Sequence, residues 1–166
     1  MPVVYTCRIF KVLEEEVALP NGHRTRLSWI DHQPCIAVVP RDGKGNFLLI
    51  RQYRHATGDY LLEIPAGSVD GGETPEDCVQ RELREETGFR AGRITKLFAG
   101  FLLPGYGNEY MHFYLAEELT AAPLPPDADE DIAVVAVSPA EVRRMLADGA
   151  IRDVKTALGL TLALQR

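Results

Sequence analysis

The chain has 166 residues, of which 46% are hydrophobic and 25% are charged, and its formal net charge is −6. These values are those of an ordinary globular protein and suit one domain with at most a small appendage. The negative charge argues against a nucleic-acid backbone as partner. No apolar run approaches the roughly 20 residues that cross a bilayer, so we expect neither a nucleic-acid nor a membrane partner.

The N-terminus and the cysteines indicate the cellular compartment. Residues 1–5 lack the basic and then apolar pattern of a secretion signal. The cysteines, Cys7, Cys35 and Cys78, are odd in number and have no C-x-x-C spacing. This pattern favours reduced, mostly buried thiols over a disulfide framework or a zinc site. We therefore expect a cytoplasmic protein.

The first 32 residues have the pattern of a β-hairpin. Residues 3–19 are strand-like, residues 20–22 (Pro-Asn-Gly) are a turn signal, and residues 24–30 can return as a second strand. A lone hairpin is marginally stable in water, so it must pack on something. Its candidate partners are the body of the protein and a second subunit.

Residues 33–166 mix strands and helices without strict alternation. Apolar segments predict strands over residues 35–39, 47–54, 61–64, 94–101, 109–116 and 132–137. Capping patterns predict helices over residues 74–88, from 138 to near 149, and over 153–165. Residues 65–73 and 121–131 have the composition of loops. This order predicts an α+β fold, an α/β/α sandwich with a mixed sheet.

The helix that begins at Thr74 carries a cluster of carboxylates. At about 100° per residue, Glu82, Glu85 and Glu86 fall within one narrow arc and repel one another, which a helix does not need for stability. A hard divalent cation relieves the repulsion, and a backbone carbonyl near Ala66 can complete its ligand shell. A solvated acidic helix face is the alternative interpretation, and the glycine-rich loop before the helix favours the metal site.

The residues from Gly67 to Phe89 carry a long motif with fixed spacing. Gly67 is followed after five residues by Glu73, and after seven more by the run over residues 81–89, Arg-Glu-Leu-Arg-Glu-Glu-Thr-Gly-Phe. This segment resembles the Nudix box, G-x5-E-x7-R-E-U-x-E-E-x-G-U, where U is apolar, at every defined position. The resemblance implies a Nudix fold over residues 33–166 and hydrolysis of a nucleoside diphosphate linked to another group.

The resemblance also assigns roles and a cofactor. It implies that Glu82 and Glu86 ligate Mg²⁺ or Mn²⁺, that Glu85 assists, and that Ala66 offers its carbonyl. Such a cation could neutralise diphosphate charge, orient the leaving group and activate water. Arg81 can pair with a glutamate and fix its rotamer.

The flanking segments resemble those of ADP-ribose and related nucleotide-sugar pyrophosphatases. Residues 62–67 resemble the run L-E-x-P-A-G, residues 104–109 resemble the loop P-G-F-[ST]-D-E, and residues 151–156 resemble the segment D-x-K-T. Residues 51–54 also match, and Arg54 corresponds to a phosphate-binding arginine. Relatives of this kind are often homodimers that exchange the N-terminal hairpin.

Several side chains are expected to bind the substrate or assist catalysis. The glutamate of the 104–109 loop lies close to the attacking water in the resembled subfamily, so Glu109 is the expected general base, with Glu85 or Glu86 as the alternative. The expected substrate-binding residues are Arg54, Arg51, Pro104, Arg26 and Trp29. Trp29 is the candidate for stacking on the base, and it could equally be a core or interface aromatic.

The loop around Glu109 departs from the subfamily pattern. Leu103 stands where a serine is usual, and Gly107-Asn108 replaces Ser/Thr-Asp. The substrate therefore remains open among ADP-ribose, GDP-mannose, ADP-glucose and other nucleoside diphosphate sugars, which would yield a nucleoside monophosphate and a sugar phosphate. The alternatives are hydrolysis of nucleoside triphosphates or dinucleoside polyphosphates, and a non-catalytic nucleotide-sugar sensor.

Overall fold

The computed structural model describes residues 2–125 and 131–166. The strands are β1 (Val3–Thr6), β2 (Phe10–Ala18), β3 (Arg24–His32), β4 (Cys35–Pro40), β5 (Phe47–Arg54), β6 (Asp59–Glu63), β7 (Ala66–Ser68), β8 (Phe89–Phe101), β9 (Tyr110–Ala121) and β10 (Ile132–Val137). The helices are α1 (Pro75–Glu82), the π-helix η1 (Leu83–Thr87), α2 (Pro139–Ala147) and α3 (Val154–Ala163). Within the described residues, no helix is long and apolar enough to span a membrane.

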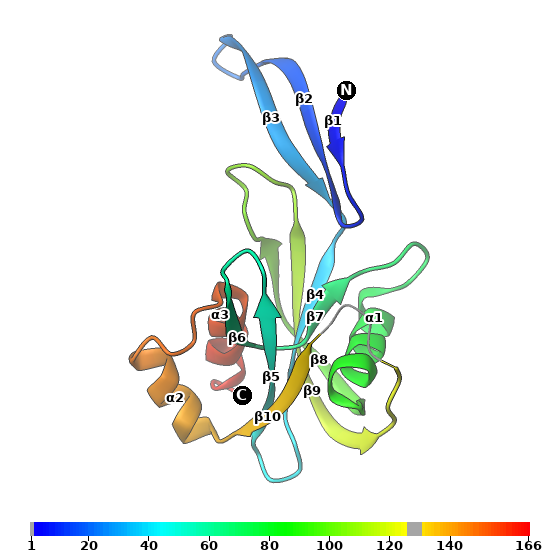
Figure 1. Cartoon of the computed structure of the whole chain (residues 1–166), viewed down its shortest axis with the longest axis vertical. Coiled ribbons are helices and arrows are strands. Elements are labelled where there is room, and N and C mark those ends of the chain that lie inside the picture. The colour runs from blue at the N-terminus through cyan, green and yellow to red at the C-terminus, as the bar shows by residue number, and fades with distance from the viewer. Residues whose placement is uncertain (1, 126–130) are drawn as a thin grey trace.

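The N-terminal segment is a three-stranded antiparallel sheet in the order β1-β2-β3, and it stands out from the body (Figure 1). The strand predicted over residues 3–19 is wrong in one respect, because a turn divides it. The Cys7 N–H donates a hydrogen bond to the Phe10 carbonyl at 3.0 Å, which closes that turn. The predicted return strand is β3, which pairs with β2 along its whole length.

The body is an α/β/α sandwich, as the sequence predicts. Its central sheet has the order β7-β4-β9-β8, with β4 and β9 parallel, and the sheet β10-β5-β6 lies beside it. Helix α1 covers one face, and α2 and α3 cover the other (Figure 1). Every residue of β4 is buried because helices pack on both sides of it.

Two apolar clusters hold these layers together. One cluster lies under α2 and α3 and includes Val39, Phe113 and Leu160. The other lies under α1 and includes Val38 and Val79. Val38 and Val39 are neighbours in β4, so alternate side chains of this one strand anchor both helical layers.

The carboxylate helix begins as predicted and ends differently. The Thr74 hydroxyl accepts a hydrogen bond from the Asp77 N–H at 3.1 Å and caps the helix, and Gly88, with φ of 78°, ends it. The predicted uniform 100° spacing is wrong over η1, where the chain forms a π-helix. The Gly88 N–H bonds to the Leu83 carbonyl, five residues back, so the turn holds one extra residue.

The predicted glycine-rich loop is partly a strand. Residues 66–68 form β7, which pairs antiparallel with the start of β4. This pairing fixes the backbone of Gly67 beside the helix, while residues 69–74 remain turn and coil. Strands β8 and β9 are longer than predicted, and β9 ends at Ala121, the first residue of the expected loop over residues 121–131. Residues 126–130 of that loop lie outside the described part of the chain.

Candidate active site

A pocket of about 440 Å³ lies where β7 meets the carboxylate helix. Its lining residues are Arg8, Ile9, Gln33, Ala66, Gly67, Ser68, Asp70, Arg81, Glu82 and Glu85. The structure therefore brings Glu82, Glu85 and Ala66 together, as the sequence predicts. The buried Glu86 approaches the same segment, because the Ala66 N–H donates a hydrogen bond to its Oε2 at 3.1 Å.

Gly67 allows the Glu82 carboxylate to lie against the backbone of β7. A Cβ built at Gly67 would stand 1.7 Å from Glu82 Oε1 and 2.2 Å from its Cδ. The two positions cannot both be filled without displacing the carboxylate, which is itself buried. The first glycine of the motif is thus explained by the space that the Glu82 carboxylate occupies.

Arg81 holds the carboxylates in place. Its guanidinium donates to Glu73 at 3.0 Å, to Glu82 at 2.6 Å and to Glu85 at 3.1 Å, and also to the Ser68 carbonyl at 3.0 Å. The hydrogen bond to Glu73 and the nearby carboxylates raise the pKa of Arg81 above its ordinary value. The same contact lowers the pKa of Glu73. The Arg81 guanidinium therefore connects the carboxylate helix to the preceding loop and to β7.

The donor set fits a hard divalent cation. Three carboxylates, those of Glu82, Glu85 and Glu86, converge beside the strand backbone at Ala66, and hard cations prefer oxygen ligands. The space that a side chain at Gly67 would fill is kept for the Glu82 carboxylate. Glu82, Glu85, Glu86 and the Ala66 carbonyl are thus the residues that could hold such a cation.

A buried ion-pair network supports the strand before the pocket. Glu63, which is 1% exposed, accepts hydrogen bonds from Arg54 at 2.7 and 2.8 Å and also pairs with Lys155. Burial by itself would raise the pKa of Glu63, but the contacts with Arg54 and Lys155 outweigh burial and lower that pKa. In the same region, the Thr156 hydroxyl accepts a hydrogen bond from the Ile64 N–H at 2.9 Å.

This network links two segments that were expected from their resemblance to other proteins. Asp153 caps α3 and lies 2.8 Å from Lys155 Nζ. Because Lys155 pairs with Glu63 and Thr156 bonds to Ile64, residues 153–156 hold residues 62–67 in place. Arg54, the expected phosphate ligand, lies at the exposed end of the network. The contact with Glu63 raises the pKa of Arg54 most, and the charge of Glu86 in the carboxylate helix raises it as well.

The loop that carries Glu109 is tied to the end of β3. The Asn108 side chain accepts a hydrogen bond from the His32 N–H at 2.8 Å and donates one to Asp31 at 2.7 Å. The Asn108 N–H also donates to the Ile30 carbonyl at 3.1 Å. The departure from the subfamily pattern at residue 108 therefore has a structural role, since it fixes the residue next to Glu109.

The expected substrate-binding residues, Arg54 included, are not among the residues that line the carboxylate pocket. Arg51 stacks on Tyr60, with its Cζ 3.6 Å from the ring centroid. Arg26 is exposed and pairs with glutamates of β2, and Trp29 lies opposite Leu13 within the N-terminal sheet. Pro104 is exposed in the loop between β8 and β9. The single chain therefore does not bring these side chains to the pocket.

The turn between β1 and β2 contributes residues that the sequence did not suggest. Arg8 and Ile9 line the pocket together with Gln33, although they are distant from the motif in sequence. One signal in the sequence is the pair of neighbouring apolar residues Ile9 and Phe10, which interrupts the alternation of Tyr5, Cys7 and Ile9. The cationic side chain that the N-terminal sheet brings to the pocket is thus that of Arg8, not that of the expected Arg26.

The comparisons with known proteins agree with this geometry. A family model described as the NUDIX domain matches residues 31–157. An ADP-ribose pyrophosphatase of Bacillus subtilis (strain 168) is 31% identical over 159 residues, which cover 95% of this chain and 86% of that protein. A GDP-mannose pyrophosphatase of Yersinia enterocolitica is 38% identical over 128 residues, which cover 72% of this chain and 66% of that protein.

A solved structure has the same fold over nearly the whole chain. It is described as an ADP compounds hydrolase, is 26% identical, and superimposes with a TM-score of 0.88 over 99% of this chain and 89% of that one. The match includes the N-terminal sheet as well as the sandwich, because so little of the chain is left out. The motif, the carboxylate pocket and these matches show that the chain belongs to the Nudix family.

Proposed function

We propose that the protein hydrolyses the diphosphate linkage of a nucleoside diphosphate sugar, with ADP-ribose and GDP-mannose as the first candidates. The products would be a nucleoside monophosphate and a sugar phosphate. The observation that carries this proposal is the carboxylate pocket. In it the Glu82 carboxylate lies against Gly67 and accepts a hydrogen bond from Arg81. The relatives named for ADP-ribose and GDP-mannose support the substrate class.

Mg²⁺ is the proposed cofactor, with Mn²⁺ as the alternative, because the donors are carboxylate and carbonyl oxygens. When bound by Glu82, Glu85, Glu86 and the Ala66 carbonyl, the cation would supply charge neutralisation and a Lewis acid at the diphosphate. Arg81 would keep the carboxylates of Glu82 and Glu85 in position through its hydrogen bonds to both.

Glu109 is proposed as the general base that takes a proton from water. Asn108 fixes the backbone next to it, and Glu109 itself is partly buried. A positioned base contributes roughly 10²- to 10⁴-fold to rate. Arg54 is proposed to contact the diphosphate, as its guanidinium is held by Glu63, which lies three residues before the pocket-lining Ala66.

The protein is proposed to act in the cytoplasm as a homodimer, with Trp29, Arg26, Arg51 and Pro104 completing the substrate site. The N-terminal sheet supports the dimer, because it stands away from the body and exposes apolar side chains (Figure 1). These include Val3, Val4, Tyr5, Ile9 and Leu27. Light scattering of the full chain tests it, and a monomer at micromolar concentration would contradict it.

A substrate screen tests the proposed reaction. The full chain is incubated with ADP-ribose, ADP-glucose, GDP-mannose, nucleoside triphosphates and dinucleoside polyphosphates, in Mg²⁺ or Mn²⁺, and the products are identified by mass. Release of a nucleoside monophosphate and a sugar phosphate is expected. Release of pyrophosphate or a higher nucleotide would instead indicate the triphosphate or dinucleoside polyphosphate reaction.

A single variant separates an enzyme from a sensor. Glu86→Gln keeps the size of the side chain and removes one charge from the cation site, so turnover should fall by at least about tenfold. Glu76→Gln, on the same helix but in contact with Tyr114, is the matched control and should keep activity. Nucleotide-sugar binding without turnover, unchanged in Glu86→Gln, would indicate a sensor and overturn the proposal.

A further inference from the structure

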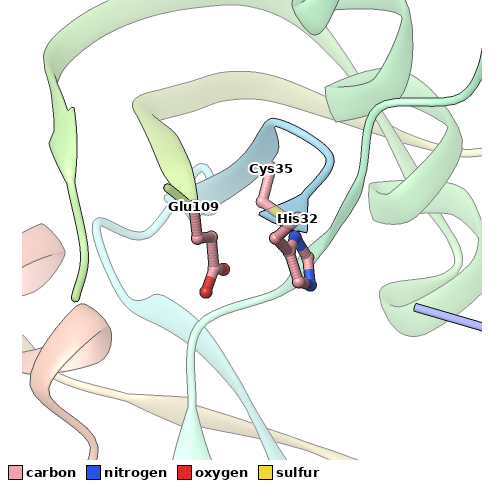
Figure 2. Close-up of side chains that lie close together, drawn as sticks. All are labelled: His32, Cys35 and Glu109. Carbon is pink, nitrogen blue, oxygen red and sulfur yellow. Dashed lines mark hydrogen bonds between the residues drawn. The ribbon is translucent and has the colours of Figure 1, made fainter. Parts of the chain in front are cut away.

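A second group of potential metal ligands lies beside the carboxylate pocket. His32 ends β3, Cys35 begins β4, and Glu109 immediately precedes β9. Strands β4 and β9 are parallel neighbours, and Cys35 is in register with Met111, so their first residues meet at one edge of the sheet. Figure 2 shows the three side chains gathered at this edge.

The separation of the sulfur and nitrogen atoms in this group matches that around a tetrahedral ion. One ligand atom from each of His32, Cys35 and Glu109 lies within 4.8 Å of the other two. The Cys35 Sγ is 3.7 Å from the His32 Nδ1. A tetrahedral zinc ion bound to sulfur and nitrogen separates those two atoms by about 3.6 Å, from its usual bond lengths. The Cys35 and His32 ligand atoms are therefore already spaced for an ion, and Glu109 lies within reach of both.

The kinds of ligand distinguish this group from the carboxylate helix. One thiol, one imidazole and one carboxylate suit a borderline-soft ion, whereas carboxylate and carbonyl oxygens suit Mg²⁺. Nothing in the Nudix motif uses His32 or Cys35, which lie well before Gly67 in the chain. Their proximity to Glu109 is therefore not explained by the proposed hydrolysis.

The imidazole and the thiol of this group both contact the Gln33 carbonyl. The His32 Nδ1 lies 2.7 Å from the Gln33 carbonyl, which also accepts from the Cys35 thiol at 3.5 Å. Burial, followed by Glu109 and Glu82, raises the pKa of the Cys35 thiol to about 12 against the lowering effect of Ser68. A bound cation would stabilise the thiolate, and the imidazole proton would move to Nε2.

We propose that His32, Cys35 and Glu109 form a binding site for Zn²⁺, separate from the carboxylate site, and that Zn²⁺ bound there inhibits the enzyme by holding Glu109. Three protein ligands leave a fourth position for water. The site borders the carboxylate pocket, because Gln33 and Ser68, which contact Cys35, also line that pocket. The inhibition rests on the proposed function, in which Glu109 is the base, but the binding does not.

Cobalt spectroscopy tests the binding without any substrate. Metal-free full-length protein in excess Mg²⁺, which occupies the carboxylate site, is titrated with Co²⁺ as a stand-in for Zn²⁺. Wild type should develop a thiolate-to-cobalt charge-transfer band that saturates at one ion per chain and is lost when Zn²⁺ is added. His32→Ala should weaken binding by at least about tenfold.

Two cysteine variants identify the sulfur ligand. Cys35→Ser should lack the charge-transfer band, and Cys35→Ala serves if the serine variant does not fold by circular dichroism. Cys7→Ser is the matched control, because Cys7 lies in the neighbouring turn and contacts Phe10 rather than Glu109. Absence of the band in wild type, its persistence in Cys35→Ser, or its loss in Cys7→Ser would each overturn the proposed site.

An activity measurement tests the inhibition separately. In excess Mg²⁺, low micromolar Zn²⁺ should lower wild-type turnover by at least about tenfold, in line with removal of a general base. Cys35→Ser and His32→Ala should keep their Mg²⁺-dependent activity and resist Zn²⁺. Equal inhibition of all variants would overturn the link to Glu109. A protein that shows the band but hydrolyses no diphosphate would refute the proposed function and leave the zinc site standing.

Discussion

The Glu82 carboxylate lies in the space that a side chain at Gly67 would fill. A Cβ at Gly67 would be 1.7 Å from Glu82 Oε1, well inside the contact distance of any two atoms. The φ angle of Gly67 is not in the left-handed region, so the backbone itself would accept another residue. A side chain at this position would therefore displace the carboxylate of the buried Glu82.

We expect Gly67→Ala to impair catalysis by displacing the Glu82 carboxylate. Loss of one correctly placed ligand should lower kcat/KM by about 10- to 100-fold. Gly71→Ala is the matched control, because Gly71 lies in the same segment with no atom within 4 Å of a Cβ. Steady-state kinetics in Mg²⁺, with thermal unfolding of both variants, make the comparison. Equal activity of the two variants would contradict this account of Gly67.

Arg81→Lys tests whether the geometry of the guanidinium matters in addition to its charge. Arg81 reaches Glu73 through Nε and both Glu82 and Glu85 through Nη1, and an ammonium group cannot reproduce that planar arrangement. We expect Mg²⁺ affinity, measured from the dependence of activity on Mg²⁺, to fall by about 10- to 100-fold. Arg84→Lys is the control, because Arg84 bonds to the Ala122 carbonyl instead. Unchanged Mg²⁺ affinity in Arg81→Lys would show that charge alone suffices.

The carboxylate site could be predicted from sequence because its residues are local. Gly67, Glu82 and Glu86 lie within one strand–loop–helix segment. In such a short segment the number of residues between two side chains determines how close they lie. The sandwich was predictable for a similar reason, since buried strands such as β4 and helix caps such as Thr74 are local patterns. The solved structure with the same fold confirms the predicted sandwich, and the family model confirms the resemblance to the Nudix family.

The features that were missed depend on contacts between distant segments. Arg8 reaches the pocket only because the first strand ends early, and His32, Cys35 and Glu109 meet only because β4 and β9 are parallel neighbours. The π-helix was missed because helical spacing of glutamates looks the same when one extra residue enters a turn. Strand order and helix irregularity leave little trace in one sequence.

Lys155→Met should destabilise the fold by leaving Glu63 with one cationic partner. Glu63 and Lys155 are both buried, and breaking a buried pair costs about 3 kcal/mol in the free energy of unfolding. Urea unfolding at pH 7 measures this loss. Arg152→Met is the matched control, because its partner Asp59 is exposed and an exposed pair contributes little.

The same pair predicts how the difference depends on pH. The folded pKa of Glu63 is lowered below its ordinary value of 4.5, so its contribution is fully present above that value and is lost as the pH falls through the folded pKa. The gap in stability between wild type and Lys155→Met should therefore be largest near neutrality and narrow below pH 4.5. A gap that stays constant from pH 7 to pH 3 would mean that Lys155 does not act through the charge of Glu63.

Asn108→Ala should impair catalysis by releasing the segment that carries Glu109. The Asn108 side chain makes two hydrogen bonds, with the His32 N–H at 2.8 Å and with Asp31 at 2.7 Å, and both disappear in the variant. Because Glu109 is then held by fewer contacts, we expect kcat to fall by about tenfold while KM changes little. Asn21→Ala is the control, since Asn21 makes a comparable bond to the His23 N–H at 3.0 Å, far from the pocket. If both variants lose stability equally and neither loses kcat, Asn108 is only a structural tether and does not position the base.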